Sequence, residues 1–75
     1  MDTNTYLTQS EAAEFLRLSP RTLERHRVAG TGPKFTKLGK RVVYRFSELD
    51  TWATERTFTS TAEADEALAA GPEAA

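Results

Sequence analysis

The stretch TQSEAAEFLRLSPRTLERHRVAG, residues 8–30, contains two helix-start signals separated by one short turn. Thr8 is a good N-cap, and Glu11 three positions later completes a capping box. Ser19-Pro20 is the second start, because a proline at the first helical position sacrifices no hydrogen bond. Gly30 suits the end of the second helix. The stretch therefore predicts two short helices joined by a tight turn.

Both predicted helices have one face suited to a protein core. The inward positions of the first helix, at helical spacing, are Ala12, Phe15 and Leu16. This helix is expected to end within residues 16–18. Leu23 and His26 point inward from the second helix, where His26 is expected to pack as a half-buried polar aromatic residue. The opposite face of the second helix carries Arg21, Arg25 and Val28 at i, i+4, i+7.

A β-hairpin is predicted after the second helix. Residues 35–38 and 41–46 have the composition of two strands, and Gly39-Lys40 suits a two-residue turn with glycine first. Alternation in the second strand places Val42 and Tyr44 on one side and leaves the other side to carry charge. Because an isolated hairpin is unstable in water, this one is expected to pack against the helices.

A third helix is predicted to begin at Ser47, with Asp50 three residues later as a second capping pair. Its inner or boundary face carries Leu49, Trp52, Ala53 and Arg56. A small core also needs the remaining aromatic side chains, so core positions are predicted for Phe15, Phe35, Tyr44 and Phe46. The predicted fold is mainly α with a small β-hairpin, in the order helix, turn, helix, hairpin, helix.

The net charge of −1 averages two unlike parts of the chain. Residues 17–45 contain nine basic side chains against Glu24 alone, a net charge of +8. Residues 58–75 contain four acids and no base, and are expected to be disordered or to form a frayed helix through Ala70. This asymmetry is typical of a polyanion-binding body with an acidic tail, although a solvated charged surface is the alternative.

Composition excludes several classes of function. Seventy-five residues allow one domain with a marginal core, assigned here to residues 6–57 after a flexible segment at 1–5. The absence of cysteine removes disulfides and thiolate zinc sites, and His26 has no second histidine or nucleophile motif beside it. We therefore expect no catalytic residue, no metal and no cofactor. No run is apolar enough to span a bilayer, and no signal peptide is recognisable, so a cytoplasmic, nucleoid-associated location is expected.

The second helix has the features of a helix that reads DNA. Such a helix needs long donors near its N-terminus, where side chains reach base edges. The candidate base-reading residues are Arg21, Thr22 and Arg25. The arginines suit guanine, and the threonine suits a thymine methyl or a phosphate. The alternative is a solvated helix face with local ion pairs to Glu24.

Further basic residues suit the DNA backbone. The hairpin tip gathers Lys37, Lys40 and Arg41, which are predicted to reach a phosphate or the minor groove. Alternatively, these charges only protect a sheet edge. More generic candidates for phosphate contact are Arg17, Arg27, Lys34 and Arg45, with Ser10 and Ser19 at helix N-termini. For the two serines, helix capping is already a sufficient explanation.

Four runs of the sequence together resemble the small MerR-like helix-turn-helix proteins, in particular excisionases and AlpA-type phage regulators. These runs are YLTQSEAAEFL at residues 6–16, LSPRTL at 18–23, KLGKRVVY at 37–44 and SELDTW at 47–52. The resemblance implies a winged helix-turn-helix over residues 6–57, with the second helix in the major groove. It places base reading at Arg21, Thr22 and Arg25, and the wing at Lys40 and Arg41.

The resemblance implies a sequence-specific double-stranded DNA-binding protein without enzymatic activity, an excisionase that bends attachment-site DNA and directs integrase-mediated excision. A transcription regulator of the same fold is the nearest alternative, and a protein-interaction adaptor is a third. The expected partners are double-stranded DNA, neighbouring copies of the protein on tandem sites, and a site-specific integrase. MerR regulators proper add a long dimerisation helix and an effector domain, which are absent from this sequence, so no small-molecule effector is expected.

Overall fold

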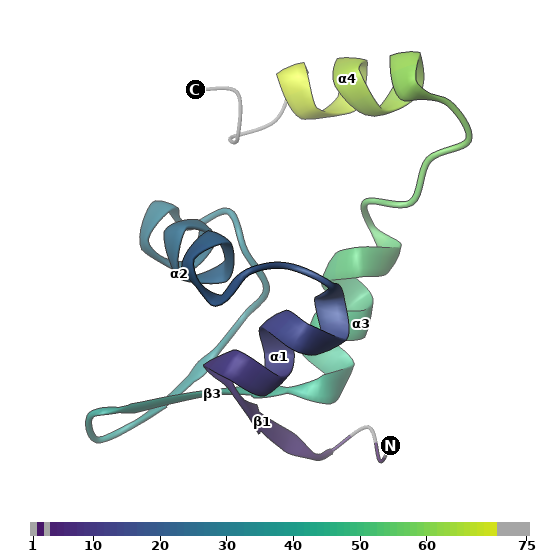
Figure 1. The fold of residues 1–75 in the computed structure, drawn as a ribbon. Helices are drawn as coiled ribbons and strands as arrows, with labels where there is room; N and C mark the ends of the chain where they lie inside the picture. The colour runs from purple at the N-terminus through teal and green to yellow at the C-terminus, as the bar shows by residue number, and fades with distance from the viewer. Residues whose placement is uncertain (1, 3, 71–75) are drawn as a thin grey trace.

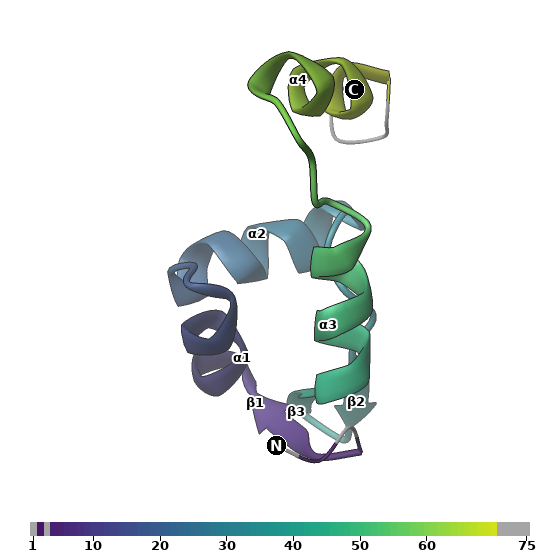
Figure 2. The ribbon, with the colours of Figure 1, turned by 90° about the vertical axis from the view of Figure 1, so that its right-hand side faces the viewer.

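A computed structural model describes residue 2 and residues 4–70 of the chain. The elements in chain order are β1 (Tyr6–Thr8), α1 (Gln9–Leu16), α2 (Pro20–Ala29), β2 (Thr36–Leu38), β3 (Arg41–Arg45), α3 (Phe46–Thr54) and α4 (Thr61–Ala70). Helices α1, α2 and α3 lie on one side of a small sheet, and α4 stands apart from them (Figure 1). The view in Figure 2 shows the same arrangement, with the three helices above the strands. No helix in the described part of the chain is long and apolar enough to cross a membrane.

The predicted helix starts of α1 and α2 are confirmed. The Thr8 side chain accepts a hydrogen bond from the Glu11 backbone N–H at 3.2 Å, and the Glu11 carboxylate accepts one from the Thr8 N–H at 2.9 Å. The Ser19 hydroxyl accepts from the Thr22 N–H at 3.1 Å. Helix α1 ends at Leu16, within the predicted range, because Arg17 takes the left-handed conformation at φ 61°. The turn to α2 is thereby kept short.

The strands form a three-stranded antiparallel sheet in the order β1-β3-β2. The hairpin turn is confirmed: Leu38 pairs with Arg41 around Gly39-Lys40, and Gly39 has φ +64°. The strand bounds are shorter than predicted, since β2 begins at Thr36 and β3 ends at Arg45. Strand β1 was not predicted, because three residues directly before a helix show no recognisable alternation. It exists because β3 offers it a free edge.

The core lies between the helices and one face of the sheet. Its buried residues are Leu7, Ala12, Ala13, Leu23, Tyr44 and Leu49, with Leu16, Val42 and Phe46 packed against them. The core prediction was wrong for Phe15 and Phe35, which are 40% and 44% exposed. The fully buried residues of α1 are instead Ala12 and Ala13. Phe15 lies at the rim, where its ring contacts the Phe46 ring at 4.8 Å.

The other face of the sheet departs from simple alternation. Val43 was expected on the charged side of β3, yet it is buried. It lies in the central strand, paired with Thr8 on one side and Thr36 on the other. This burial goes with its place in the central strand, while the exposed Arg45 on the same side keeps the expected charge.

The predicted cap of α3 was wrong. The helix begins at Phe46, one residue before Ser47, and its N-cap Arg45 makes no side-chain capping bond. Instead, the Phe46 N–H donates to the Thr5 carbonyl at 2.9 Å. The Thr5 carbonyl, just before β1, thus satisfies the first N–H of α3, a donor that has no partner within the helix. The inner position of Leu49 is confirmed, since Leu49 is fully buried.

Helix α4 occupies part of the acidic tail. Its first turn is capped by Ser60, whose hydroxyl accepts from the Glu63 N–H at 3.1 Å. The Thr59 hydroxyl donates to the Glu63 carboxylate at 2.6 Å. Beyond α4, the expectation for residues 71–75 lies outside the described residues. In the described tail, local hydrogen bonds rather than packing against the sheet hold the first turn of α4.

Candidate nucleic-acid interface

Helix α2 is mounted with one face in the core and one face in solvent. Leu23 is fully buried beneath it, while Arg21 and Arg25 are exposed on the other side. Val28 continues this exposed stripe and is itself 80% exposed. The stripe borders a shallow depression on the helix surface, lined by Arg21, Glu24, Arg25, Val28 and Ala29. Two arginines at helical spacing therefore project together into solvent, as the sequence predicted.

Thr22 differs from its arginine neighbours in exposure and bonding. It is half-buried, and its hydroxyl shares a 2.8 Å hydrogen bond with the Ser19 hydroxyl. The hydroxyl is therefore engaged at the N-terminus of α2, close to the cap. The neighbouring Ser19 is exposed, and so is Ser10 in the first turn of α1.

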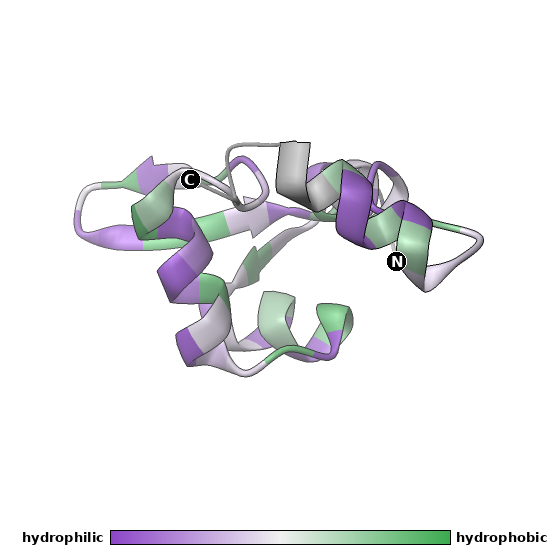
Figure 3. Cartoon of the chain, turned by 90° about the horizontal axis from the view of Figure 1, so that it is seen from above, coloured by the Kyte–Doolittle hydropathy of each residue, from purple (hydrophilic) through white to green (hydrophobic). Residues whose placement is uncertain are grey.

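The hairpin places its basic residues at an exposed end of the sheet. Lys37, Lys40 and Arg41 are all exposed. Figure 1 shows the hairpin extending past α1 and α3 on the side of the molecule where α2 lies. Much of α2 and of the hairpin is coloured as hydrophilic in Figure 3. Helix α2 and the hairpin tip lie on the same side of the molecule in Figure 1, and we call their exposed basic residues together the α2–hairpin face.

The remaining phosphate candidates divide into two groups. Arg17, in the turn between α1 and α2, is exposed, and so is Lys34 in the loop that leads to β2. By contrast, Arg45 lies at the other end of β3 from the tip, about 13 Å along the strand from Arg41. Arg27 is only 18% exposed. Arg17 and Lys34 are therefore exposed, whereas Arg27 is mostly covered and Arg45 lies at the opposite end of β3 from the hairpin tip.

Arg45 is already held by a side chain of β1. Its guanidinium donates to the Tyr6 hydroxyl at 2.7 Å and lies 5.3 Å from the centre of the Tyr6 ring. This hydrogen bond raises the pKa of Arg45 above its ordinary value. Tyr6 and Arg45 are register partners in the β1–β3 pair, which explains why the two side chains meet.

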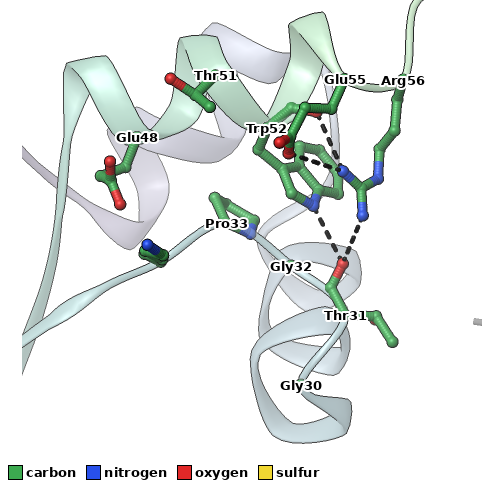
Figure 4. Close-up of a pocket in the computed structure, with 10 residues that line it drawn as sticks. Gly30, Thr31, Gly32, Pro33, Glu48, Thr51, Trp52, Glu55 and Arg56 are labelled. Atoms are coloured by element: carbon green, nitrogen blue, oxygen red, sulfur yellow. Dashed lines mark hydrogen bonds and ion pairs between the residues drawn. The ribbon is translucent and has the colours of Figure 1, made fainter. Parts of the chain in front are cut away.

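The C-terminal end of α2 is tied to α3 through Thr31. The Trp52 indole N–H donates to the Thr31 carbonyl at 3.0 Å, and Arg56 donates to the same oxygen at 3.4 Å (Figure 4). The His26 ring shares a 2.7 Å hydrogen bond with the Thr31 hydroxyl and meets the Trp52 ring edge-on at 5.6 Å. The predicted role of His26 as a half-buried packing residue is confirmed. These bonds fix the end of α2 against α3.

Sequence reasoning missed the part played by Gln9. Its side chain donates to the Pro20 carbonyl at 3.3 Å and also accepts a hydrogen bond from Arg27. It therefore joins the start of α1 to α2. No local pattern marks a glutamine at the first position of a helix for such a role, because its partners lie in another element.

A helix-turn-helix whose second helix is exposed and basic, beside a basic hairpin, has the architecture of a winged helix-turn-helix. This is a class of DNA-binding protein. The family model described as helix-turn-helix domain matches residues 6–57. Because the match covers most of the chain, the protein belongs to this helix-turn-helix family, and DNA is its partner. A comparison with curated protein sequences finds no match to the chain.

Proposed function

We propose that this protein binds a specific double-stranded DNA sequence and acts as an excisionase of a mobile element. One observation carries the DNA-reading part of the proposal. Arg21 and Arg25 project from the same exposed face of α2, while Leu23 anchors the opposite face in the core. A helix held in this way can enter the major groove without exposing the core.

The proposed contacts follow from exposure and position. Arg21 and Arg25 read base edges, with guanine as the preferred partner of each. Thr22 approaches the same groove through its methyl group, since its hydroxyl is engaged by Ser19. The wing contacts come from Lys37, Lys40 and Arg41. Backbone phosphates are held by Arg17 and Lys34, with Ser10 and Ser19 at the two helix N-termini.

One module of this size reads few base pairs. Tight and selective binding therefore requires several copies side by side on repeated sites. An excisionase binds such repeats beside an attachment site, bends the DNA and helps an integrase to run excision. Self-association on DNA and an integrase partner are accordingly parts of the proposal. DNA bending is a further part of the proposal, and its deformation energy would be repaid by the contacts of several bound copies.

A titration of duplex DNA at two salt concentrations tests the DNA-binding step. Binding to a duplex selected by the protein from a random pool should weaken steeply as salt rises, because phosphate contacts release counterions. Binding to two tandem copies of that site should exceed the sum of binding to isolated copies. Failure to bind any duplex at low salt would instead favour a protein-interaction adaptor.

A transcription regulator of the AlpA type shares this fold and surface, so the biological role needs a separate experiment. Deleting the gene should reduce the excised circular form of the mobile element, measured by amplification across the joined ends. Adding purified protein to integrase and attachment-site DNA should restore excision. Unchanged excision together with altered transcription from a nearby promoter would favour the regulator.

A further inference from the structure

Arg27 lies on the inner side of α2, among side chains from several elements. Its guanidinium donates to the Gln9 side-chain carbonyl in α1 and to the Tyr44 hydroxyl in β3, the latter at 3.5 Å. It also forms a 3.7 Å ion pair with Glu24, one turn earlier in α2. The Phe35 ring, in the loop before β2, lies 5.9 Å from the guanidinium carbon. The planar guanidinium therefore joins α1, α2 and the hairpin at one point.

Gln9 extends this connection to the other end of α2. Its amide nitrogen donates to the Pro20 carbonyl at 3.3 Å, while its amide oxygen accepts from Arg27. Pro20 and Arg27 are the first and eighth residues of α2. One glutamine side chain thus bonds to both ends of the helix, so a rotation of α2 about its axis would break at least one bond.

Tyr44 connects the hydrogen bonds of Arg27 to the hairpin. It is fully buried in the core and belongs to the central strand of the sheet. A buried hydroxyl needs a hydrogen-bond partner, and Arg27 supplies a donor to it. The same strand continues to the basic hairpin tip. The hydrogen bond from Arg27 to Tyr44 therefore links α2 to the strand that leads to the wing.

We propose that Arg27 and Gln9 are positioning residues that set the orientation of α2 relative to the hairpin for DNA reading. Arg27 is thereby assigned to this internal role and not to phosphate contact. The geometry supports the assignment, because the guanidinium is mostly covered and its donors point to Gln9 and Tyr44. The consequence for binding rests on the proposed function, whereas the orientation itself can be measured without DNA.

Arg27→Lys and Gln9→Ala separate positioning from charge. Lysine keeps the positive charge of Arg27 but has a single nitrogen, so it cannot reach Gln9 and Tyr44 from one nitrogen and Glu24 from another as the guanidinium does. Gln9→Ala changes no charge at all. Arg45→Lys is the matched control, because it makes the same exchange at an exposed arginine held by Tyr6, away from the α2–hairpin face. Thermal unfolding of each variant establishes the temperature at which all of them are folded.

The first measurement is the ratio of affinities for the selected duplex and a scrambled duplex. We expect Arg27→Lys and Gln9→Ala each to reduce this ratio by roughly tenfold, the effect of misplacing one base contact. The double variant should lose little more than either single variant, because the two residues act through one connection. The dependence of affinity on salt should stay unchanged in all three, and Arg45→Lys should match the wild type.

Two results would overturn the proposal. In the first, Arg27→Lys and Gln9→Ala keep a near-normal ratio of affinities for the selected and scrambled duplexes. If, in addition, Arg27→Met lowers the slope of log affinity against log salt by roughly 0.9, Arg27 contacts a phosphate. Reduced thermal stability with an unchanged affinity ratio would make the pair structural only. Residual dipolar couplings in the absence of DNA give the independent readout: the variants should change the angle between α2 and the hairpin. If that angle changes while the wild type binds no duplex, positioning stands and the proposed function fails.

Discussion

Thr8 and Val43 are register partners in the β1–β3 pair, and Thr8 is at the same time the N-cap of α1. Val43 also pairs with Thr36 of the hairpin strand β2. The central strand therefore connects the helix-turn-helix unit directly to the wing. This junction explains why a three-residue strand persists at the edge of the sheet, since its last residue also starts a helix.

Thr8→Ala should destabilise the protein through loss of the capping box. The Thr8 hydroxyl satisfies the Glu11 N–H, and alanine leaves that donor to water. The expected loss is about 1 kcal/mol of unfolding free energy, measured by urea denaturation. Thr8→Ser keeps the acceptor and should retain most of the stability. If Thr8→Ala and the wild type unfold at the same urea concentration, the assigned role of the cap is contradicted.

Gly39→Ala should weaken the hairpin through backbone strain alone. Gly39 has φ +64°, and a Cβ added there meets no atom within 4 Å, so no steric clash contributes. The left-handed conformation costs a non-glycine residue roughly 1–2 kcal/mol, to be measured as a loss of unfolding free energy. Lys40→Ala, at the next turn position, serves as the stability control. A Gly39→Ala protein as stable as this control would rule out the proposed turn geometry.

Arg21→Ala and Arg25→Ala should each reduce affinity for the selected duplex by roughly 1–3 kcal/mol and relax the preference for one base position. Both side chains are exposed, so protein stability should change little. Binding to duplexes carrying each single base change gives the preference. If either substitution lowers affinity equally for every sequence, the residue contacts a phosphate and the base-reading assignment fails.

Lys40→Ala should weaken binding to all sequences by a similar factor. Lys40 lies in the exposed hairpin turn, where its ammonium group suits a phosphate rather than a base edge. The slope of log affinity against log salt should fall in magnitude by roughly 0.9 for the lost phosphate contact. Glu14→Ala, at an exposed position on α1, is a control for surface substitution. An unchanged slope would remove the wing tip from the interface.

Local sequence signals predicted the helix-turn-helix and the hairpin turn well. The capping box at Thr8, the serine cap before Pro20 and the glycine at position 39 all act as expected. Each depends on groups only a few residues apart, so the sequence alone contains the interacting partners. The exposed arginines of α2 were predictable for the same reason, because helical spacing defines the face opposite Leu23.

The three-dimensional structure decided what depends on distant partners. Strand β1 forms because β3 returns beside it, and α3 starts at Phe46 because the Thr5 carbonyl accepts its N–H. Arg27 was indistinguishable by sequence from its exposed neighbours, yet Gln9 and Tyr44 surround it.

The sequence by itself therefore determined which segments form helices, where the hairpin turns, and which face of α2 is basic, because capping and turn formation are local interactions. Only the tertiary structure decided which basic side chains remain free for DNA, because burial and long-range hydrogen bonds arise when elements far apart in the chain come into contact.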